Sequence, residues 1–204
     1  MLRRSFVQSL PGALLVVVAT SLPAAAHVGH GESGGFAHGF LHPFGGMDHI
    51  LAMVSVGMLA ALVGKRLGTG SLWAFPAAFM GMMSVGAMLA MANFHLPFVE
   101  IGIALSVVTL GLAVALQMPL PLLAGMALVG FFAVFHGFAH GAEMPVDASM
   151  LTYWAGFLLA TALLHLAGIG MRFALGQWVP AANVVARLAG IAIAAAGIGL
   201  MAAG

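Results

Sequence analysis

Cysteine is absent from this sequence, which excludes disulfides and thiolate metal sites. Charged side chains are scarce as well: they make up 5% of the 204 residues, whereas hydrophobic side chains make up 63%. A soluble domain is nearer half apolar and about a quarter charged. Walker and Rossmann glycine patterns are also missing, so no nucleotide partner is expected. These absences predict an all-α integral membrane protein whose main solvent is the bilayer.

The N-terminal segment 1–26 is predicted to be a cleavable signal peptide. Arg3 and Arg4 supply the positive start, a short apolar run follows, and the small residues 24–26 form a cleavage site. We expect cleavage after Ala26, and an uncleaved first helix is the alternative. Without Arg3 and Arg4, the mature chain has four basic residues against five acidic ones. That balance gives no reason to expect a nucleic-acid partner.

Residues 27–204 are expected to form one domain, a bundle of six transmembrane helices. A membrane-spanning helix needs about 20 predominantly apolar residues. The six stretches that meet this length are 45–64, 72–92, 97–116, 120–141, 150–172 and 183–203. No connection between them is long enough for a soluble domain, so the lipid bilayer is the main surrounding partner. The sequence leaves the oligomeric state open, a homo-oligomer included.

Basic residues predict how the bundle is oriented in the membrane. If the signal peptide is exported, the mature N-terminus is periplasmic and the chain is a multi-pass protein of the bacterial inner membrane. The remaining basic residues then all fall on the cytoplasmic side: Lys65, Arg66, Arg172 and Arg187. The acidic residues and eight of the nine histidines fall on the outer side, and His165 alone lies deep in a helix. This asymmetry predicts a functional vestibule that opens to the periplasm.

One candidate metal site is the segment FHGFAHGAE, at the end of the fourth predicted span. His136 and His140 are four residues apart and Glu143 follows three residues later, so the three side chains share one helix face. Two imidazoles and a carboxylate suit a divalent cation of borderline softness. Gly137 and Gly141 form a G-x-x-x-G pattern, which lets another helix approach closely. The alternative is that these histidines only bond across helices or cap the outer end.

A second candidate metal site is the segment HPFGGMDH, at the start of the first mature span. It holds His42, Asp48 and His49, while Pro43 and the glycine pair 45–46 argue against a regular helix. An irregular turn would fold His42 back over the other two side chains as a coordinating lip, since non-helical backbone is tolerated where it lines a wet cavity. The alternative is an ordinary helix start, with Pro43 in the first turn and Asp48 near the positive end of the helix dipole.

We expect the two segments to form one metal site. Both lie at the polar ends of their helices on the same membrane face, and each alone has few ligands for a first-row ion. Asp48, His49, His136 and His140 should therefore surround a common point. Whether Glu143 belongs to this shell stays open: it is a candidate ligand on the same helix face, but it is one more turn outward along its helix.

Two further residues are candidate ligands along a path through the membrane. Glu100 is predicted to lie a turn inside the outer boundary and to supply charge midway, since an intramembrane carboxylate is a functional hypothesis by default. His165 lies deeper, either as a second station for the ion or as a buried histidine with a hydrogen-bond partner. His95 is a weaker candidate, and the histidines that precede residue 42 lie on a glycine-rich strand that could gather metal.

The two segments resemble the motifs of the HupE/UreJ family of bacterial nickel permeases. His42, Pro43, Asp48 and His49 match the family's pattern of His-Pro, small residues and Asp-His, and FHGFAHGAE is similar to its histidine-rich fourth helix. The resemblance implies a cleaved signal, six spans and the uptake of nickel, sometimes cobalt, for hydrogenase or urease. Ligand chemistry alone does not select nickel, because binding strength follows the Irving–Williams order whichever metal is biological.

We therefore expect an inner-membrane transporter that takes up Ni²⁺ or Co²⁺ from the periplasm, and not an enzyme. The metal is cargo, so neither a prosthetic group nor a catalytic residue is expected. The expected metal-binding residues are His42, Asp48, His49, Glu100, His136, His140, Glu143 and His165. Two alternatives stay open: an intramembrane metal-dependent hydrolase, which would hold one metal tightly, and a haem-binding membrane protein, which would need histidines near mid-membrane.

The orientation leads to a testable prediction about topology. Reporter fusions after residue 66 should be cytoplasmic, because Lys65 and Arg66 resist export, and fusions near residue 146 should be periplasmic. N-terminal sequencing of the mature protein should begin at His27. The reverse reporter pattern would turn the vestibule toward the cytoplasm and would make uptake the wrong direction.

Overall fold

The computed structural model describes residues 32–145, 149–178 and 181–203. These residues form seven α-helices and two short 3-10 helices, η1 (His42–Phe44) and η2 (Thr69–Trp73), with no strand among them. The prediction of an all-α chain is therefore confirmed. The predicted signal peptide, residues 1–26, lies outside the described residues.

Each stretch predicted to span the membrane is a helix. These helices are α2 (Met47–Leu67), α3 (Ala74–Met91), α4 (Val99–Ala115), α5 (Leu122–Ala142), α6 (Met150–Trp178) and α7 (Ala182–Ala203). Within the described part of the chain, five of these six segments are long and apolar enough to cross a membrane, and α4 is the exception. α4 is apolar but has 17 residues, about 26 Å in length against a hydrocarbon core of about 30 Å. The chain is a multi-pass membrane protein.

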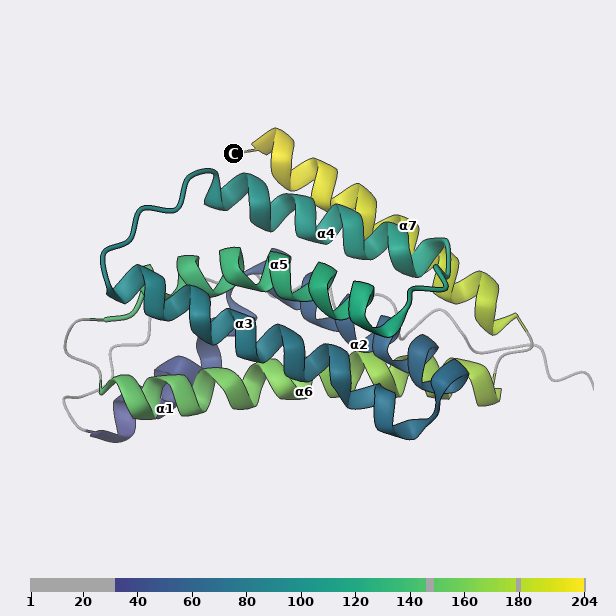
Figure 1. The fold of residues 1–204 in the computed structure, drawn as a ribbon, viewed down its shortest axis with the longest axis horizontal. Coiled ribbons are helices and arrows are strands. Elements are labelled where there is room, and N and C mark those ends of the chain that lie inside the picture. The colour runs from purple at the N-terminus through teal and green to yellow at the C-terminus, as the bar shows by residue number, and fades with distance from the viewer. Residues whose placement is uncertain (1–31, 146–148, 179–180, 204) are drawn as a thin grey trace, which may run out of the picture.

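An additional helix, which the sequence pattern does not predict, precedes the first span. α1 (Glu32–Leu41) packs along the beginning of α6 (Figure 1). A Cβ atom on Gly39 would collide with the backbone of Tyr153, and one on Gly156 would collide with the backbone of Phe36. The glycines of this segment therefore permit close helix packing. The expectation of a glycine-rich strand at the mature start is wrong for residues 32–38, which are part of α1.

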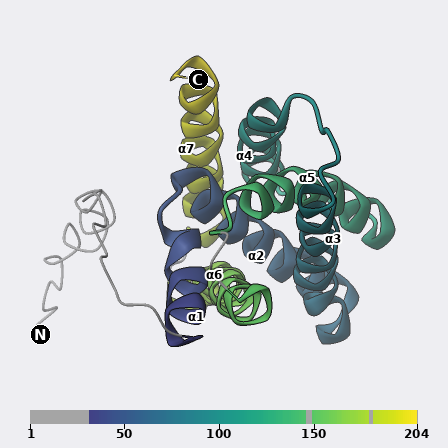
Figure 2. The ribbon, with the colours of Figure 1, turned by 90° about the vertical axis from the view of Figure 1, so that its left-hand side faces the viewer.

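α2 is the central helix of the bundle. It packs against α6 and α4, while α3 runs along α5 and α4 runs along α7 (Figure 1, Figure 2). Of its apolar window, 61% is buried inside the structure, against at most 39% for the other candidate spans of the described residues. Met53, Val56 and Leu59 of α2 are almost completely buried. The helix that begins within HPFGGMDH is thus the one most fully enclosed among the five candidate spans.

The close helix approach predicted from the G-x-x-x-G pattern of α5 is confirmed, and the partner helix is α3. A Cβ atom on Gly137 would collide with the backbone carbonyl of Met83, and Gly141 also lies directly against the α3 backbone. Gly86 of α3 meets the backbone carbonyl of Val134 on α5 in the same way. Glycines on both helices therefore let the two backbones touch.

Gly86→Ala should destabilise the protein, because the added methyl group would overlap the Val134 carbonyl and force α3 and α5 apart. The expected cost is about 1–3 kcal/mol, the usual range for overpacking. Gly81→Ala is the matched control, since Gly81 is on the same helix and a Cβ atom there meets nothing within 4 Å. Thermal unfolding in detergent measures both, and equal melting temperatures for the two variants would contradict this account of the packing.

Candidate metal centre

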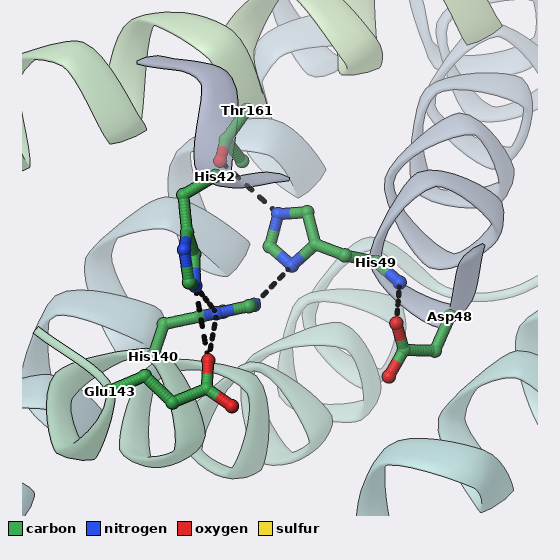
Figure 3. Close-up of polar contacts among 6 residues, drawn as sticks. All are labelled: His42, Asp48, His49, His140, Glu143 and Thr161. Carbon is green, nitrogen blue, oxygen red and sulfur yellow. Dashed lines mark hydrogen bonds and ion pairs between the residues drawn. The ribbon is translucent and has the colours of Figure 1, made fainter. Parts of the chain in front are cut away.

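Four histidines and a glutamate converge where η1 and the start of α2 meet the end of α5. Figure 3 shows the glutamate, Glu143, with His42, His49 and His140. His42 lies in η1 and His49 lies in the first turn of α2. His136 and His140 lie in the last two turns of α5, and Glu143 follows that helix directly. Segments that are about 100 residues apart in the sequence therefore supply one cluster of nitrogen and oxygen donors.

The irregular backbone predicted for HPFGGMDH is observed. Pro43 occupies an early position of the 3-10 turn, where its missing N–H costs nothing. The backbone N–H of Gly45 donates to the His42 carbonyl at 2.9 Å and closes the turn. Gly46 is then extended, with φ −108° and ψ 122°, before α2 begins. This break in the helical path brings the His42 side chain to the end of α5 and leaves His49 in the register of α2.

The outer group consists of His42, His140 and Glu143. The Nε2 atom of His42 lies 2.9 Å from the Nδ1 atom of His140 and 3.0 Å from a carboxylate oxygen of Glu143. The Nδ1 atom of His140 lies 3.3 Å from the same oxygen. Two ligands at right angles around an ion, each about 2.1 Å from it, are about 3.0 Å apart. The three donor atoms therefore already have the spacing of one face of a coordination shell.

The inner group consists of His49, His136 and His140. One ring nitrogen from each residue lies within 4.8 Å of those of the other two. The Nε2 atom of His140 is 2.9 Å from the Nδ1 atom of His49. His49 and His136 are completely buried, whereas Glu143 in the outer group is more than half exposed. The inner group is therefore the dry part of the centre and the outer group is the part that meets solvent.

His140 belongs to both groups through its two ring nitrogens. Its Nδ1 atom faces His42 and Glu143, and its Nε2 atom faces His49 (Figure 3). A neutral imidazole has one lone pair and one N–H group. A neutral His140 can therefore act as a ligand in one group at a time, while its other nitrogen donates a hydrogen bond.

Two hydroxyl groups that sequence reasoning missed contact the inner histidines. The Oγ1 atom of Thr161 on α6 lies 3.4 Å from the Nε2 atom of His49. The Oγ atom of Ser106 on α4 lies 2.7 Å from the Nε2 atom of His136. A histidine that binds a metal through one ring nitrogen usually makes a hydrogen bond with the other. No sequence signal identifies these residues, because single serines and threonines are common in helices of every kind.

The acidic residues are arranged differently from the sequence expectation. Asp48 was expected beside the imidazoles, but its carboxylate accepts a hydrogen bond from the backbone N–H of His49 at 2.7 Å and points away from the rings (Figure 3). It lies at the N-terminus of α2, where the helix dipole favours negative charge. The place of Glu143 was left open by the sequence, and its carboxylate lies within the outer group. Two residues that are adjacent in a helix diverge by about 100°, and His49 takes the inward direction here.

Glu100 and His165 lie apart from both groups. Glu100 is exposed in the first turn of α4, so its carboxylate is at a helix end, and it belongs to neither donor group. His165 is 1% exposed, and neither of its ring nitrogens has a hydrogen-bond partner among the described residues. The Phe79 ring lies 5.6 Å from the His165 ring and 5.7 Å from the His136 ring, measured between centroids. His95 is exposed in the connection before α4.

Glu143 is held in its charged form by the histidines of the outer group. Hydrogen bonds from His140 and His42 lower the pKa of its carboxyl group well below the usual range, against the opposing effect of its partial burial. A carboxylate that accepts two such bonds favours ionisation. Glu143 therefore keeps its negative charge at neutral pH, which suits a divalent cation.

Comparison with known proteins agrees with the motifs. The sequence model of the family described as HupE / UreJ protein matches residues 15–200. "Protein HupE" from Rhizobium leguminosarum bv. viciae is 42% identical over 186 residues, which cover 91% of this chain and 94% of that protein. No solved structure matches the chain.

The charge state of Glu143 can be tested by a carboxyl-carbon NMR titration of the labelled protein, with Glu143→Gln to assign the signal. Glu143 should stay ionised as the pH falls through about 4.3, the ordinary value for glutamate. Because its folded-state pKa is lowered, its contribution to stability is complete above that pH and is lost as the pH falls through the folded value. His140→Ala should raise the pKa, and His95→Ala should leave it unchanged. An ordinary glutamate titration in the wild type would contradict the hydrogen-bonded arrangement.

Proposed function

Because the chain belongs to the HupE/UreJ family, we propose that it takes up Ni²⁺, and Co²⁺ as a second cargo, across the bacterial inner membrane. Nickel and cobalt transport for hydrogenase or urease is associated with this family in general. The metal is transported rather than kept as a cofactor. The observation that carries the proposal is the pair of donor groups that share His140.

The position of the two groups supports an inward route from one membrane face. The outer group is partly exposed and charged, so it is suited to exchange water for protein ligands. The inner group is buried and has imidazole ligands only. Lys65 and Arg66 are in the last turn of α2, and His49 is in the first turn. By the positive-inside rule the donor groups then face the periplasm, with α4 completing six spans.

Transfer of the ion between the groups follows from the chemistry of His140. An ion in the outer group uses the lone pair of Nδ1, and an ion in the inner group uses the lone pair of Nε2. The neutral side chain offers only one lone pair, so this transfer requires the ring hydrogen of His140 to leave Nε2 and a hydrogen to be taken up at Nδ1, an exchange that water at the partly exposed outer group can carry. The outer group therefore loses a ligand when the inner group gains one. Neither group then holds the ion too tightly for it to move on, which transport requires.

His165 is the proposed station beyond the inner group. Its nitrogens are buried without partners among the described residues, and an intramembrane titratable residue is functional by default. Phe79 lies against the rings of both His136 and His165, so in this proposal an ion moves from one to the other alongside this aromatic ring. A cation is attracted to an aromatic face, which lowers the cost of that passage.

The other two carboxylates among the candidate ligands, Asp48 and Glu100, have supporting roles in this proposal. Asp48 accepts the hydrogen bond of the His49 backbone N–H and so holds the first turn of α2 in place. Its charge also lies next to the site and attracts cations. Glu100, exposed in the first turn of α4, adds negative charge to the outer surface. Charges of one sign around a cleft raise the local concentration of the opposite ion.

Radioactive nickel uptake at limiting metal tests the proposal. His49→Ala and His140→Ala should each reduce uptake by at least about tenfold, since the loss of one ligand leaves the others under-coordinated. His95→Ala is the control, because His95 is exposed and lies in neither donor group. Cobalt should compete with nickel. If His140→Ala reaches the membrane and transports nickel normally, the shared ligand has no role and the proposed route fails.

A further inference from the structure

Ser106 belongs to neither donor group, but it makes a buried contact with His136 of the inner group. Both side chains are 0% exposed, and they come from α4 and α5, thirty residues apart. The Ser106 Oγ atom lies 2.7 Å from the His136 Nε2 atom and 2.6 Å from the backbone carbonyl oxygen of Ile103. The hydroxyl group therefore has two close polar neighbours and one hydrogen to share between them.

The position of that hydrogen follows from the chemistry of the two neighbours. The Ile103 carbonyl can only accept, so the contact between the two oxygens requires Ser106 to donate. If the hydroxyl instead donated to His136, lone pairs of Ser106 and Ile103 would face each other at 2.6 Å. The arrangement that satisfies both contacts is a relay, in which the His136 Nε2–H group donates to Ser106 and Ser106 donates to Ile103.

This relay leaves the lone pair of His136 on Nδ1. That nitrogen is buried and has no hydrogen-bond partner among the described residues. A buried polar atom without a partner is costly, and native proteins leave few of them. His136 belongs to the inner group, so an ion that bound its Nδ1 atom there would supply the missing partner.

We propose that Ser106 is a positioning residue for the transported ion: it holds His136 in the Nε2–H tautomer and so keeps Nδ1 free as a ligand. This inference rests on the proposed function. Without the hydroxyl group, nothing among the described contacts of His136 favours one tautomer, and the N–H of the other tautomer would occupy the nitrogen that must bind the cation. A hydrogen bond donated by Nε2–H also makes Nδ1 a stronger metal ligand.

The tautomer can be measured without any metal. Nitrogen-15 NMR of the full chain, labelled at histidine and purified metal-free in detergent, distinguishes a ring nitrogen that carries hydrogen from one with a lone pair. His136→Gln identifies the signals of His136. The expected result is a hydrogen on Nε2 and a lone pair on Nδ1. A hydrogen on Nδ1 in the wild-type protein would overturn the inference, and this measurement requires no variant of Ser106.

Nickel binding by equilibrium dialysis tests the positioning role. Ser106→Ala should weaken binding by about 10- to 100-fold, the usual effect of removing a hydrogen-bond partner of a metal ligand. Ser55→Ala is the matched control, because Ser55 is also 0% exposed and its hydroxyl has no partner among the described residues. Ser106→Thr keeps the hydroxyl group and should restore most of the affinity. Equal binding by the Ser106→Ala and Ser55→Ala proteins would overturn the role of Ser106.

The same measurements separate this inference from the proposed function. A wild-type protein with the reversed His136 tautomer that still transports nickel would overturn the role of Ser106 alone. A wild-type protein with the expected tautomer that binds neither nickel nor cobalt would overturn the proposed function, and the role of Ser106 with it. Addition of Zn²⁺ as a diamagnetic probe should shift the Nδ1 signal of His136, and a shift of Nε2 in its place would contradict the assigned ligand atom.

Discussion

Direct contact between helix backbones at glycine is the constraint on which the metal centre depends. At Gly137 the backbone of α5 contacts that of α3, and at Gly57 the backbone of α2 contacts that of α6 at His165. Neighbouring residues of a helix diverge by about 100°, so the face of α5 next to the glycines carries the histidines toward α2. The result is a distance of 2.9 Å between ring nitrogens of His140 and His49. A larger residue at the glycine positions would move these nitrogens out of reach of one ion.

Buried polar atoms without hydrogen-bond partners lower the stability of this helix bundle. Polar groups inside a membrane protein are costly unless they have partners, and Ser106 illustrates the rule with two hydrogen-bonding neighbours. His136 and His165 are exceptions, because they keep buried ring nitrogens without partners among the described residues. A nitrogen that the protein satisfies completely has no lone pair left for an ion. In the proposed function, the same atoms therefore weaken the folded state and make the route selective for a cation that replaces the missing partner.

Local properties of the sequence were sufficient for much of the fold. Hydropathy located six helices, because the number of apolar residues that crosses a bilayer depends on the chain itself. Pro43 and the neighbouring glycines predicted the irregular turn before α2, since both residue types act on their own backbone. α1 was not predicted, because it is short and rich in glycine and its glycines fit the backbone of α6. A helix that depends on a distant partner leaves little local signal.

The sequence by itself determined that the chain is helical and embedded in a membrane, and that histidines gather at the beginning of α2 and the end of α5. Hydropathy and helical spacing are properties of neighbouring residues, so a single chain carries them. Only the tertiary structure decided that the Asp48 carboxylate points away from the imidazole rings and that Glu143 contacts His42. It also decided that Ser106 contacts His136. These contacts join helices that are tens of residues apart, and they depend on the rotation and separation of packed helices. No spacing along the chain encodes that geometry.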